Sequence, residues 1–184
     1  HRGPDGRGYV AFQGEDNASQ SQGFHSTRFW NQPQGSSRLI KVGIGNRRLK
    51  ILDLSEEGAQ PMSTADGRFW LTFNGLIYNF ENLKSALSLS TRSTCDTEVM
   101  LSVLSQDWDE GLSKLNGIFA CALYDAKTKK LLLARDPVGV KPLYYLIEDQ
   151  TLYFASEIKS LLPLLVSRPQ MRLDLVERYL MNNW

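Results

Sequence analysis

Alternating and helical patterns of apolar residues divide the middle of the chain into a strand followed by helices. Apolar residues recur on one side of an extended segment before Asn74, and beyond it they recur at helical spacing. Asn79 stands just ahead of the first helical pattern and is a favourable N-cap residue. The elements predicted here are a strand over Arg68–Phe73, a helix over Phe80–Leu87, a helix from Asp96 or Thr97 to Gln106, and a shorter amphipathic helix or turn over Trp108–Leu115.

The second half of the chain contains apolar runs of strand length, separated by polar turns. Such runs are typical of strands in a sheet that is covered on both faces. Asp174, followed three residues later by Glu177, resembles a capping box and predicts the start of a final helix. The predicted elements are strands over Ile118–Tyr124, Leu131–Ala134, Leu143–Ile147 and Leu152–Ala155, a short helix over Ser156–Leu162, and a helix over Leu175–Asn182.

The first part of the chain is predicted to be a glycine-rich loop that leads into a strand, followed by polar surface loops. A strand over Leu39–Ile44 is expected to be interrupted by Gly45–Arg48 and to continue as an extended or turn-like path over Leu49–Leu54. The strands therefore fall into two groups with helices between them. This order favours an α+β or layered α/β fold and excludes a regular strand–helix repeat.

Length, composition and charge narrow the class of protein. The 184 residues are enough for one domain with a buried core, and the 42% hydrophobic content is ordinary for a globular chain. A net charge of +1 argues against nucleic acid as the main partner. No apolar run approaches the length of a membrane-spanning helix. Two cysteines, Cys95 and Cys121, form neither a metal signature nor a disulfide framework, and indicate a reducing compartment.

Few residues offer chemistry of a familiar kind. With only His1 and His25, the sequence contains no evident Ser-His-Asp constellation, no zinc ligand set and no glycine-rich phosphate loop. Asn74 and Gly75 together supply an amide NH2 and an unshielded backbone N–H, which suit an oxyanion hole, although Asn-Gly is also a common turn dipeptide. No metal site is predicted.

Two charged residues at the ends of predicted elements are the other candidates. Arg48 is expected to end a turn, where it serves either a surface salt bridge or a substrate carboxylate. Asp96 begins a helix, where it serves either as a cap or as a ligand for an ammonium group. Together they suit the two ends of an amino acid. The loop in Ala134–Tyr145 is interpreted as rigid and structural, with Arg135, Asp136 and Lys141 in local ion pairs.

Several segments, taken in order, resemble the class II glutamine amidotransferase domain of the asparagine synthetase family. The resemblance spans nearly the whole chain. Its motifs are RGPDG at Arg2–Gly6, GxxRL at Gly45–Leu49, QPM at Gln60–Met62, NGxIYN at Asn74–Asn79, DTEV at Asp96–Val99, LNGxFA at Leu115–Ala120, ARDxxGxKPLYY at Ala134–Tyr145 and SEIKSLL at Ser156–Leu162.

The resemblance implies a fold and a set of roles. The family has the N-terminal-nucleophile hydrolase fold, an αββα sandwich of two antiparallel sheets, in which an N-terminal Cys attacks the side-chain amide of glutamine with its own α-amine as general base. Ammonia then passes to an ATP-using synthetase domain. The residues matched to the glutamine site are Asn74 and Gly75 (oxyanion hole), Arg48 (carboxylate clamp), Asp96 (amine ligand), and the backbone of Ile51 and Leu52 (pocket lining).

The sequence also departs from the family pattern. The chain begins at His1, next to the RGPDG motif, so we expect the family's Cys, first strand and first helix to be missing from it and the chain alone to be inactive. Leu76 stands where the family has Glu, a ligand of the substrate amine, so glutamine binding is expected to be weakened or altered. Asn46 replaces a common His. The ATP-pyrophosphatase segment of the synthetase domain is absent from residues 1–184.

Two functions follow from the resemblance. The first is the glutaminase domain of an asparagine-synthetase-like enzyme; the alternative is a non-catalytic domain of the same fold, as β-lactam synthetases exemplify. A glutaminase for sugar or nucleotide amination fits the motifs less well. The implied partners are glutamine and a C-terminal synthetase domain of the parent chain, and a homodimer of the parent is left open. The domain itself needs no cofactor, the synthetase domain implies ATP and magnesium, and the implied location is the cytoplasm.

Overall fold

The computed structural model describes residues 3, 6–13, 40–49, 56–167, 169–170 and 172–182. By its internal contacts the chain divides into two compact units, His1–Pro142 and Leu143–Trp184.

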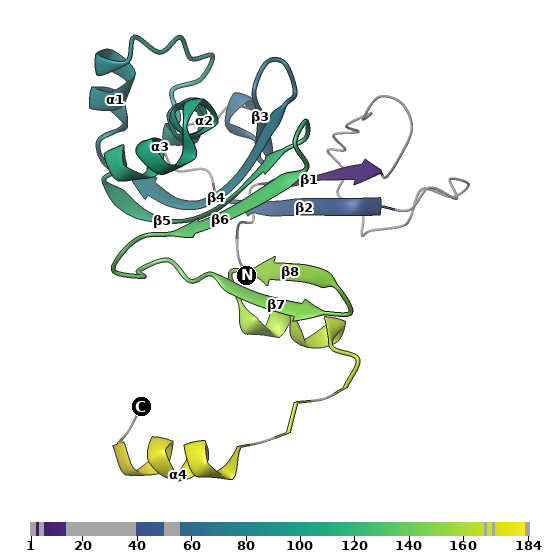
Figure 1. Ribbon diagram of the computed structural model, residues 1–184. Helices are drawn as coiled ribbons and strands as arrows, with labels where there is room; N and C mark the ends of the chain where they lie inside the picture. The colour runs from purple at the N-terminus through teal and green to yellow at the C-terminus, as the bar shows by residue number, and fades with distance from the viewer. Residues whose placement is uncertain are drawn as a thin grey trace. The chain divides into compact units, whose positions relative to one another are not determined.

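The first unit contains two antiparallel sheets (Figure 1). β1 pairs with β2, and the second sheet has the order β3-β4-β5-β6, with every neighbouring pair antiparallel. The predicted α+β class is therefore confirmed for this unit. Its strands are β1 (Gly6–Gln13), β2 (Ile40–Arg48), β3 (Met62–Ser63), β4 (Phe69–Ile77), β5 (Gly117–Asp125) and β6 (Lys130–Arg135), and a short 3-10 helix, η1 (Glu56–Gly58), precedes β3.

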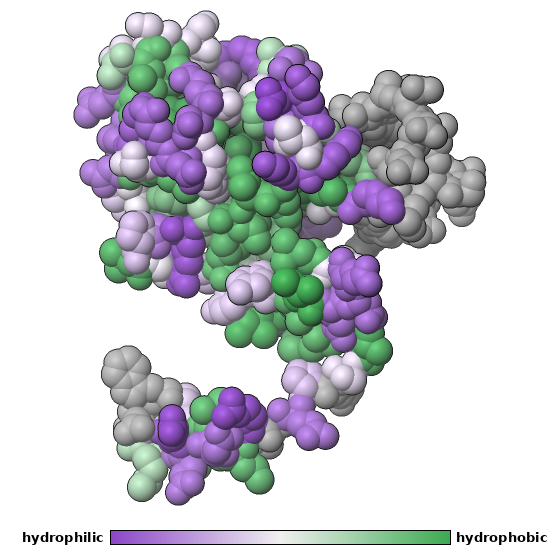
Figure 2. Space-filling view, viewed as in Figure 1, coloured by the Kyte–Doolittle hydropathy of each residue, from purple (hydrophilic) through white to green (hydrophobic). Residues whose placement is uncertain are grey.

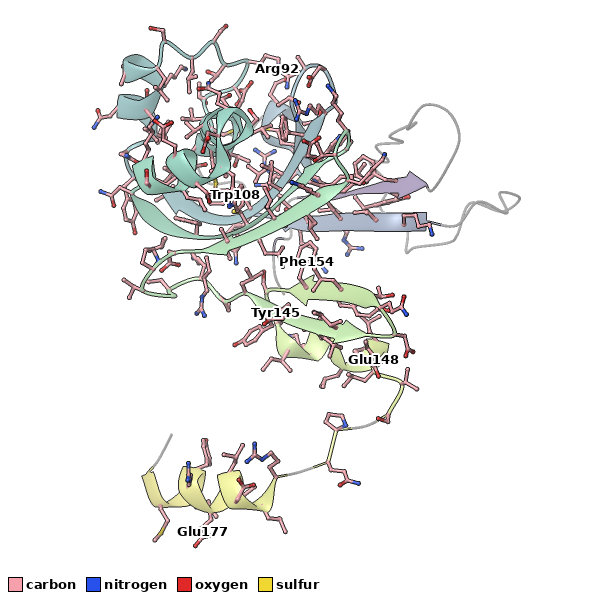
Figure 3. All side chains as sticks on the ribbon, viewed as in Figure 1. Arg92, Trp108, Tyr145, Glu148, Phe154 and Glu177 are labelled. Atoms are coloured by element: carbon pink, nitrogen blue, oxygen red, sulfur yellow. The ribbon has the colours of Figure 1, made fainter. Side chains whose placement is uncertain are left out.

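Helices α1 (Phe80–Ala86), α2 (Asp96–Gln106) and α3 (Trp108–Lys114) lie on one face of the four-stranded sheet (Figure 1). Their bounds agree with the predicted helices to within one residue. Every second residue of β4 and β5 faces α2, in accordance with the two-residue period of a strand. Trp108, at the start of α3, packs against this core (Figure 3). The buried core residues of the two strands are Leu71, Phe73, Ile77, Phe119, Cys121 and Leu123, and those of α2 are Val99, Met100, Leu101, Val103 and Leu104.

The opposite face of β4 and β5 packs against the β1–β2 sheet. The ring of Phe12 on β1 lies 5.7 Å from that of Trp70 on β4 and 4.6 Å from that of Tyr124 on β5. On β2, the Asn46 amide donates to the Thr72 hydroxyl at 3.1 Å. The four-stranded sheet is thus covered on both faces, as its apolar strands predict.

The prediction that β4 ends before Asn74 is wrong. The strand runs without a break to Ile77, and Asn74 and Gly75 pair with Ala120 and Phe119 of β5. The two backbones lie very close together here, because a Cβ atom added at Gly75 would stand 2.0 Å from the Ile118 carbonyl oxygen. The Asn-Gly dipeptide therefore marks a close contact inside a sheet and not a turn.

The predicted interruption of the strand at Gly45–Arg48 is also wrong. β2 is continuous to Arg48, and its polar residues pair in register with β1 as far as the pair Arg48–Gly6. Cross-strand hydrogen bonding extends through polar residues as readily as through apolar ones, so the loss of apolar pattern did not mark the end of the strand. Arg48 is consequently the last residue of a strand.

Two charged side chains form hydrogen bonds with backbone groups of the loop after β6. The Asp136 carboxylate accepts the backbone N–H groups of Phe119, Val140 and Lys141 at 3.2, 2.9 and 3.0 Å. The Arg135 guanidinium donates to the carbonyls of Lys141 and Gly139. These hydrogen bonds give the loop the structural role that was predicted, but the expected ion pairs among Arg135, Asp136 and Lys141 do not form in the described residues, because backbone groups bind the charged atoms of Arg135 and Asp136.

The second unit consists of a hairpin, two single-turn 3-10 helices and a final helix. The Glu148 carboxylate on β7 accepts the Val166 N–H at 3.1 Å and so fixes the segment after η3 (Figure 3). Tyr145 and Ile147 are 68% and 67% exposed, and apolar side chains gather over the hairpin in Figure 2. The elements are β7 (Tyr144–Glu148), β8 (Thr151–Ala155), η2 (Ile158–Ser160), η3 (Leu162–Leu164) and α4 (Leu173–Asn182).

Two predictions for the second unit need correction. The single helix predicted over Ser156–Leu162 is a pair of 3-10 turns, with Pro163 at the start of the second. The final helix begins at Leu173, and Asp174 lies within its first turn and pairs with Arg172 instead of capping. No helix in the described parts of the chain is both long and apolar enough to cross a membrane.

Gly75→Ala tests the close approach of β4 and β5. We expect it to lower the free energy of unfolding by about 2 kcal/mol or more, because the new methyl group meets backbone atoms of β5 that cannot move aside. Gly43→Ala on β2 is the matched control, since nothing lies within 4 Å of a Cβ atom there. Urea unfolding of the intact protein measures both; equal stability of the two variants would contradict the assignment.

Asp136→Asn tests the role of the buried carboxylate. Burial raises the pKa of Asp136, but the backbone N–H groups of Lys141, Val140 and Phe119 outweigh that effect and lower it to about 2. The stabilisation from this carboxylate is therefore fully present above its ordinary pKa of 3.8 and is lost as the pH falls toward 2. The stability gap between wild type and variant, followed by thermal unfolding from pH 7 to pH 2, should narrow over this range; a gap independent of pH would exclude this role.

Candidate functional site

Asn74 presents a half-buried side chain in the middle of β4. By the alternation of the strand it shares a face with Thr72 and Leu76, turned away from α2 and toward the side where β2 packs. Within the described residues the Asn74 amide makes no hydrogen bond. A polar amide that is half removed from water and lacks a protein partner is available to a ligand.

Asp96 is a buried carboxylate at the start of α2. It is only 5% exposed, and its Oδ2 accepts the Ile77 N–H of β4 at 2.9 Å. Burial raises the pKa of Asp96, and the hydrogen bonds from the N–H groups of Ile77 and Thr97 only partly offset this effect. None of the ion pairs among the described residues involves Asp96. Among the described residues the buried charge therefore has no cationic partner of the kind that such a group normally has.

Asp96 is not the cap of its helix. The N-cap residue is Cys95, and the acidic residue that binds backbone N–H groups ahead of the helix is Glu98. Its carboxylate accepts the N–H groups of Arg92 and Ser93 at 3.0 and 2.7 Å and the Ser93 hydroxyl at 2.6 Å. Arg92 itself lies in the loop ahead of α2 (Figure 3). Glu98 thus holds the loop ahead of this helix in place, and Asp96 is not needed for that purpose.

Arg48 places its guanidinium against the backbone of Gly58. A Cβ atom added at Gly58 would stand 2.1 Å from Nη2 of Arg48, so only glycine leaves room for the side chain in this position. Gly58 ends η1 and is buried. The Arg48 side chain of β2 therefore packs against Gly58 at the end of η1.

The structure brings the backbones of these candidates close to one another. Asp96 binds the N–H of Ile77, three residues beyond Asn74 on the same strand. The contact between Asn46 and Thr72 joins β2 to β4, two residues before Arg48 and two residues before Asn74. Of the other predicted site residues, Leu76 lies on β4 and pairs with Ile118 of β5, and Ile51 and Leu52 lie outside the described residues.

Asn79 has a structural role that differs from the predicted one. It precedes α1, but its side chain makes no capping hydrogen bond. Its Nδ2 donates to the Lys114 carbonyl at 2.9 Å, and its Oδ1 accepts the Asn116 N–H at 3.0 Å. Asn79 therefore fastens the end of β4 to the connection between α3 and β5.

Sequence reasoning missed Gln60 as a structural centre near these residues. Its side chain reaches β2, β4 and α2 at once. The only sign of it in the sequence is its place in the QPM segment, and that motif indicates no physical role for the side chain.

Neither cysteine has the features of a nucleophile. Both are buried. Burial raises the pKa of the Cys121 thiol to about 12, and the Cys95 sulfur lies 3.0 Å from the Ser93 hydroxyl. No group of three His, Cys, Asp or Glu side chains within the described residues is placed to hold a metal ion.

A family model and individual relatives agree on the family to which this chain is similar. Residues 33–184 match the model of the glutamine amidotransferase domain family. An asparagine synthetase (glutamine-hydrolyzing) of Bacillus subtilis is 38% identical over 165 residues, which are 88% of this chain and 22% of that protein. A putative asparagine synthetase (glutamine-hydrolyzing) of Methanocaldococcus jannaschii is 33% identical over 156 residues, 75% of this chain and 30% of that protein. The chain thus spans less than a third of the length of these relatives.

A solved structure gives the fold. Glutamine phosphoribosylpyrophosphate amidotransferase from B. subtilis superposes with a TM-score of 0.68 over 88% of this chain and 37% of that chain, at 24% sequence identity. At that identity the likeness concerns the fold alone. Together with the antiparallel sheets, it identifies the chain as an N-terminal-nucleophile hydrolase fold, as predicted.

Proposed function

We propose, from the premise that the chain belongs to the glutamine amidotransferase domains of the asparagine synthetase family, that it binds glutamine and serves its hydrolysis to glutamate and ammonia. The observation that supports this most directly is Asp96. A carboxylate that is 5% exposed and has no cationic partner in the described residues is costly to keep charged, unless a ligand supplies the cation. The ammonium group of an amino acid supplies it.

The other candidates then take complementary roles. The Arg48 guanidinium pairs with the glutamine α-carboxylate, and the backbone of Ile51 and Leu52 lines the same pocket. The free amide of Asn74 and the N–H of Gly75 donate to the oxygen of the side-chain amide. Both residues belong to a strand paired with β5, so the Gly75 N–H and the backbone that carries the Asn74 side chain are held in place before the charge on that oxygen develops.

The reaction needs a nucleophile from outside residues 1–184. The α-amine of an N-terminal cysteine takes the proton of the thiol, and the resulting thiolate attacks the side-chain carbonyl carbon of glutamine. A C–S bond forms, the carbonyl electrons move to oxygen, and Asn74 and Gly75 bind the resulting oxyanion. When the oxyanion collapses, the C–N bond breaks, the nitrogen takes the proton held by the α-ammonium group, and it leaves as ammonia. Water then cleaves the thioester to glutamate. Residues 1–184 alone are therefore expected to be inactive.

Leu76 alters the glutamine site. It lies on the same face of β4 as Asn74, two residues further along, where the family has a carboxylate. With leucine there, the substrate amine depends on Asp96 as its charged partner. Glutamine affinity is therefore expected to be weaker than in a protein with glutamate at this position.

The ammonia acceptor belongs to the parent protein. Since the relatives are several times longer than this chain, we propose that a C-terminal synthetase domain receives the ammonia and uses ATP and magnesium to activate a carboxylate. Residues 1–184 form its glutamine amidotransferase domain, a homodimer of the parent is compatible with this arrangement, and the expected location is the cytoplasm.

Measurement of glutamate and ammonia released from L-glutamine by the intact protein tests this function. Equal amounts of both products are expected, together with a cysteine directly after the initiator methionine. The absence of both the cysteine and the products would overturn the catalytic proposal. Glutamine binding without hydrolysis would favour the non-catalytic alternative.

Asn74→Ala tests the oxyanion role in the intact protein. We expect kcat to fall by roughly 100-fold, about 3 kcal/mol of lost transition-state stabilisation, with a smaller change in KM. Asn79→Ala is the matched control, because it also removes an asparagine side chain from the same motif, but one whose hydrogen bonds are purely structural. It should lower the melting temperature and leave kcat nearly unchanged. A rise in KM with constant kcat in Asn74→Ala would show that Asn74 binds substrate instead.

Asp96→Asn should separate binding from stability. Because burial raises the pKa of Asp96, its ionised form costs stability at neutral pH, and the neutral amide removes that cost. We expect the melting temperature to be maintained or raised, whereas glutamine affinity falls at least roughly 10-fold. In wild type, glutamine affinity should also decline as the pH falls through this raised pKa.

Asp125→Asn is the control with the opposite result. The Arg68 guanidinium, 2.8 Å away, holds the pKa of the buried Asp125 carboxyl well below its ordinary value, so this charge stabilises the fold. The variant should melt at a lower temperature and keep its glutamine affinity. If Asp96→Asn instead behaves like Asp125→Asn, in both melting temperature and calorimetric titration, Asp96 is a structural residue.

A further inference from the structure

Gln60 connects the three segments that carry the candidate site residues. Its Oε1 accepts the Phe73 N–H of β4 at 2.7 Å and the Asn46 amide of β2 at 3.2 Å. Its Nε2 donates to the Thr97 hydroxyl of α2 at 3.3 Å. Three of the four hydrogen bonds available to a glutamine side chain are thus directed to three different elements.

Each partner of Gln60 stands next to a site residue. Phe73 precedes Asn74, Thr97 follows Asp96, and Asn46 lies two residues before Arg48 and hence on the same side of β2. From these contacts we propose that Gln60 is a positioning residue, which fixes the relative placement of Arg48, Asn74 and Asp96. This inference rests on the proposed function for its catalytic consequence, but its structural part stands on the hydrogen bonds alone.

The orientation of the Gln60 amide is determined by its partners. A backbone N–H can only donate, so the atom that faces Phe73 must be the oxygen, and the NH2 group must then face Thr97. The Asn46 amide extends the network, because it also donates to the Thr72 hydroxyl at 3.1 Å. The network is partly buried, which makes the loss of one member more costly than at the surface.

The loop that carries Gln60 also supports Arg48 directly. Gly58, two residues before Gln60, lies beneath the Arg48 guanidinium, where a Cβ atom would be 2.1 Å from Nη2. On β1, a Cβ atom added at Gly8 would stand 2.0 Å from the Gln60 carbonyl oxygen. The loop therefore packs between β1 and the hydrogen-bond network of Gln60. A change at Gln60 should displace Gly58, against which Arg48 packs, as well as the backbone of β4 and the start of α2.

A positioning role predicts effects on both kinetic constants. Displacement of Asp96 and Arg48 weakens binding of the glutamine amine and carboxylate, which raises KM, and displacement of Asn74 lowers kcat. A residue that only stabilises the fold would lower the melting temperature without moving either constant, as long as the protein remains folded.

Gln60→Met in the intact protein tests the proposal, because methionine has similar length and volume but makes none of these hydrogen bonds. We expect kcat/KM for glutamine to fall at least roughly 10-fold, with contributions from kcat and KM. Arg68→Met is the matched control: it breaks a partly buried hydrogen-bonded contact of the Asp125 carboxylate at the far end of β4. It should lower the melting temperature and leave kcat/KM within about twofold of wild type. A fall in Gln60→Met no larger than in Arg68→Met would overturn the proposal.

Two further measurements cover the remaining outcomes. If Gln60→Met does not fold, Gln60→Asn applies the same criteria, since it keeps the amide but is too short to reach all three partners. If wild type itself does not process glutamine, the proposed function fails and amide hydrogen exchange decides the inference. Exchange in Gln60→Met should then accelerate around Arg48 and in the first turn of α2, at amides that do not bind Gln60. Exchange there that matches wild type would overturn it.

Discussion

The close pairing of β4 with β5 around Gly75 is the constraint on which the rest of this structure depends. At this point the two backbones approach until no Cβ atom fits at Gly75, and on the partner strand Gly117 is equally confined, with a would-be Cβ 2.3 Å from the Leu76 carbonyl oxygen. Glycine on both strands lets the ladder continue through a polar residue, Asn74, into the buried Ile77. The strand then ends where its Ile77 N–H meets the Asp96 carboxylate.

Two buried carboxylates at opposite ends of β4 differ in their partners and in the direction of their pKa shifts. Asp125 at one end of the sheet has its guanidinium partner, and its pKa is depressed accordingly. Asp96 of α2, which binds the Ile77 N–H at the other end of β4, is equally buried, and among the described residues its donors are N–H and hydroxyl groups; burial raises its pKa. A fold keeps the first arrangement for stability, whereas the second costs stability and is retained where a ligand repays it.

The sequence predicts the elements well wherever burial imposes a period, as in α2 and β5, whose bounds agree within one residue. It fails at Gly45–Arg48 and at Asn74-Gly75, because backbone pairing holds polar residues and glycine in a strand without leaving an apolar pattern. In β4 the signal was present, since the alternation Leu71, Phe73, Ile77 extends across Asn74. The motifs matched to the glutamine site name Arg48, Asn74, Gly75 and Asp96, but spacing alone does not reveal Gln60, whose importance arises from contacts between distant segments.

We propose that Arg48, Asn74 and Asp96 form one glutamine site. Calorimetric titration with L-glutamine tests it most directly, in the intact protein with the expected N-terminal cysteine replaced by alanine so that substrate is not consumed. The account predicts saturable binding of one glutamine per chain, at least roughly 10-fold weaker in Arg48→Ala, because the α-carboxylate loses its charged partner. Absence of binding, or binding that is unchanged in Arg48→Ala, would contradict it.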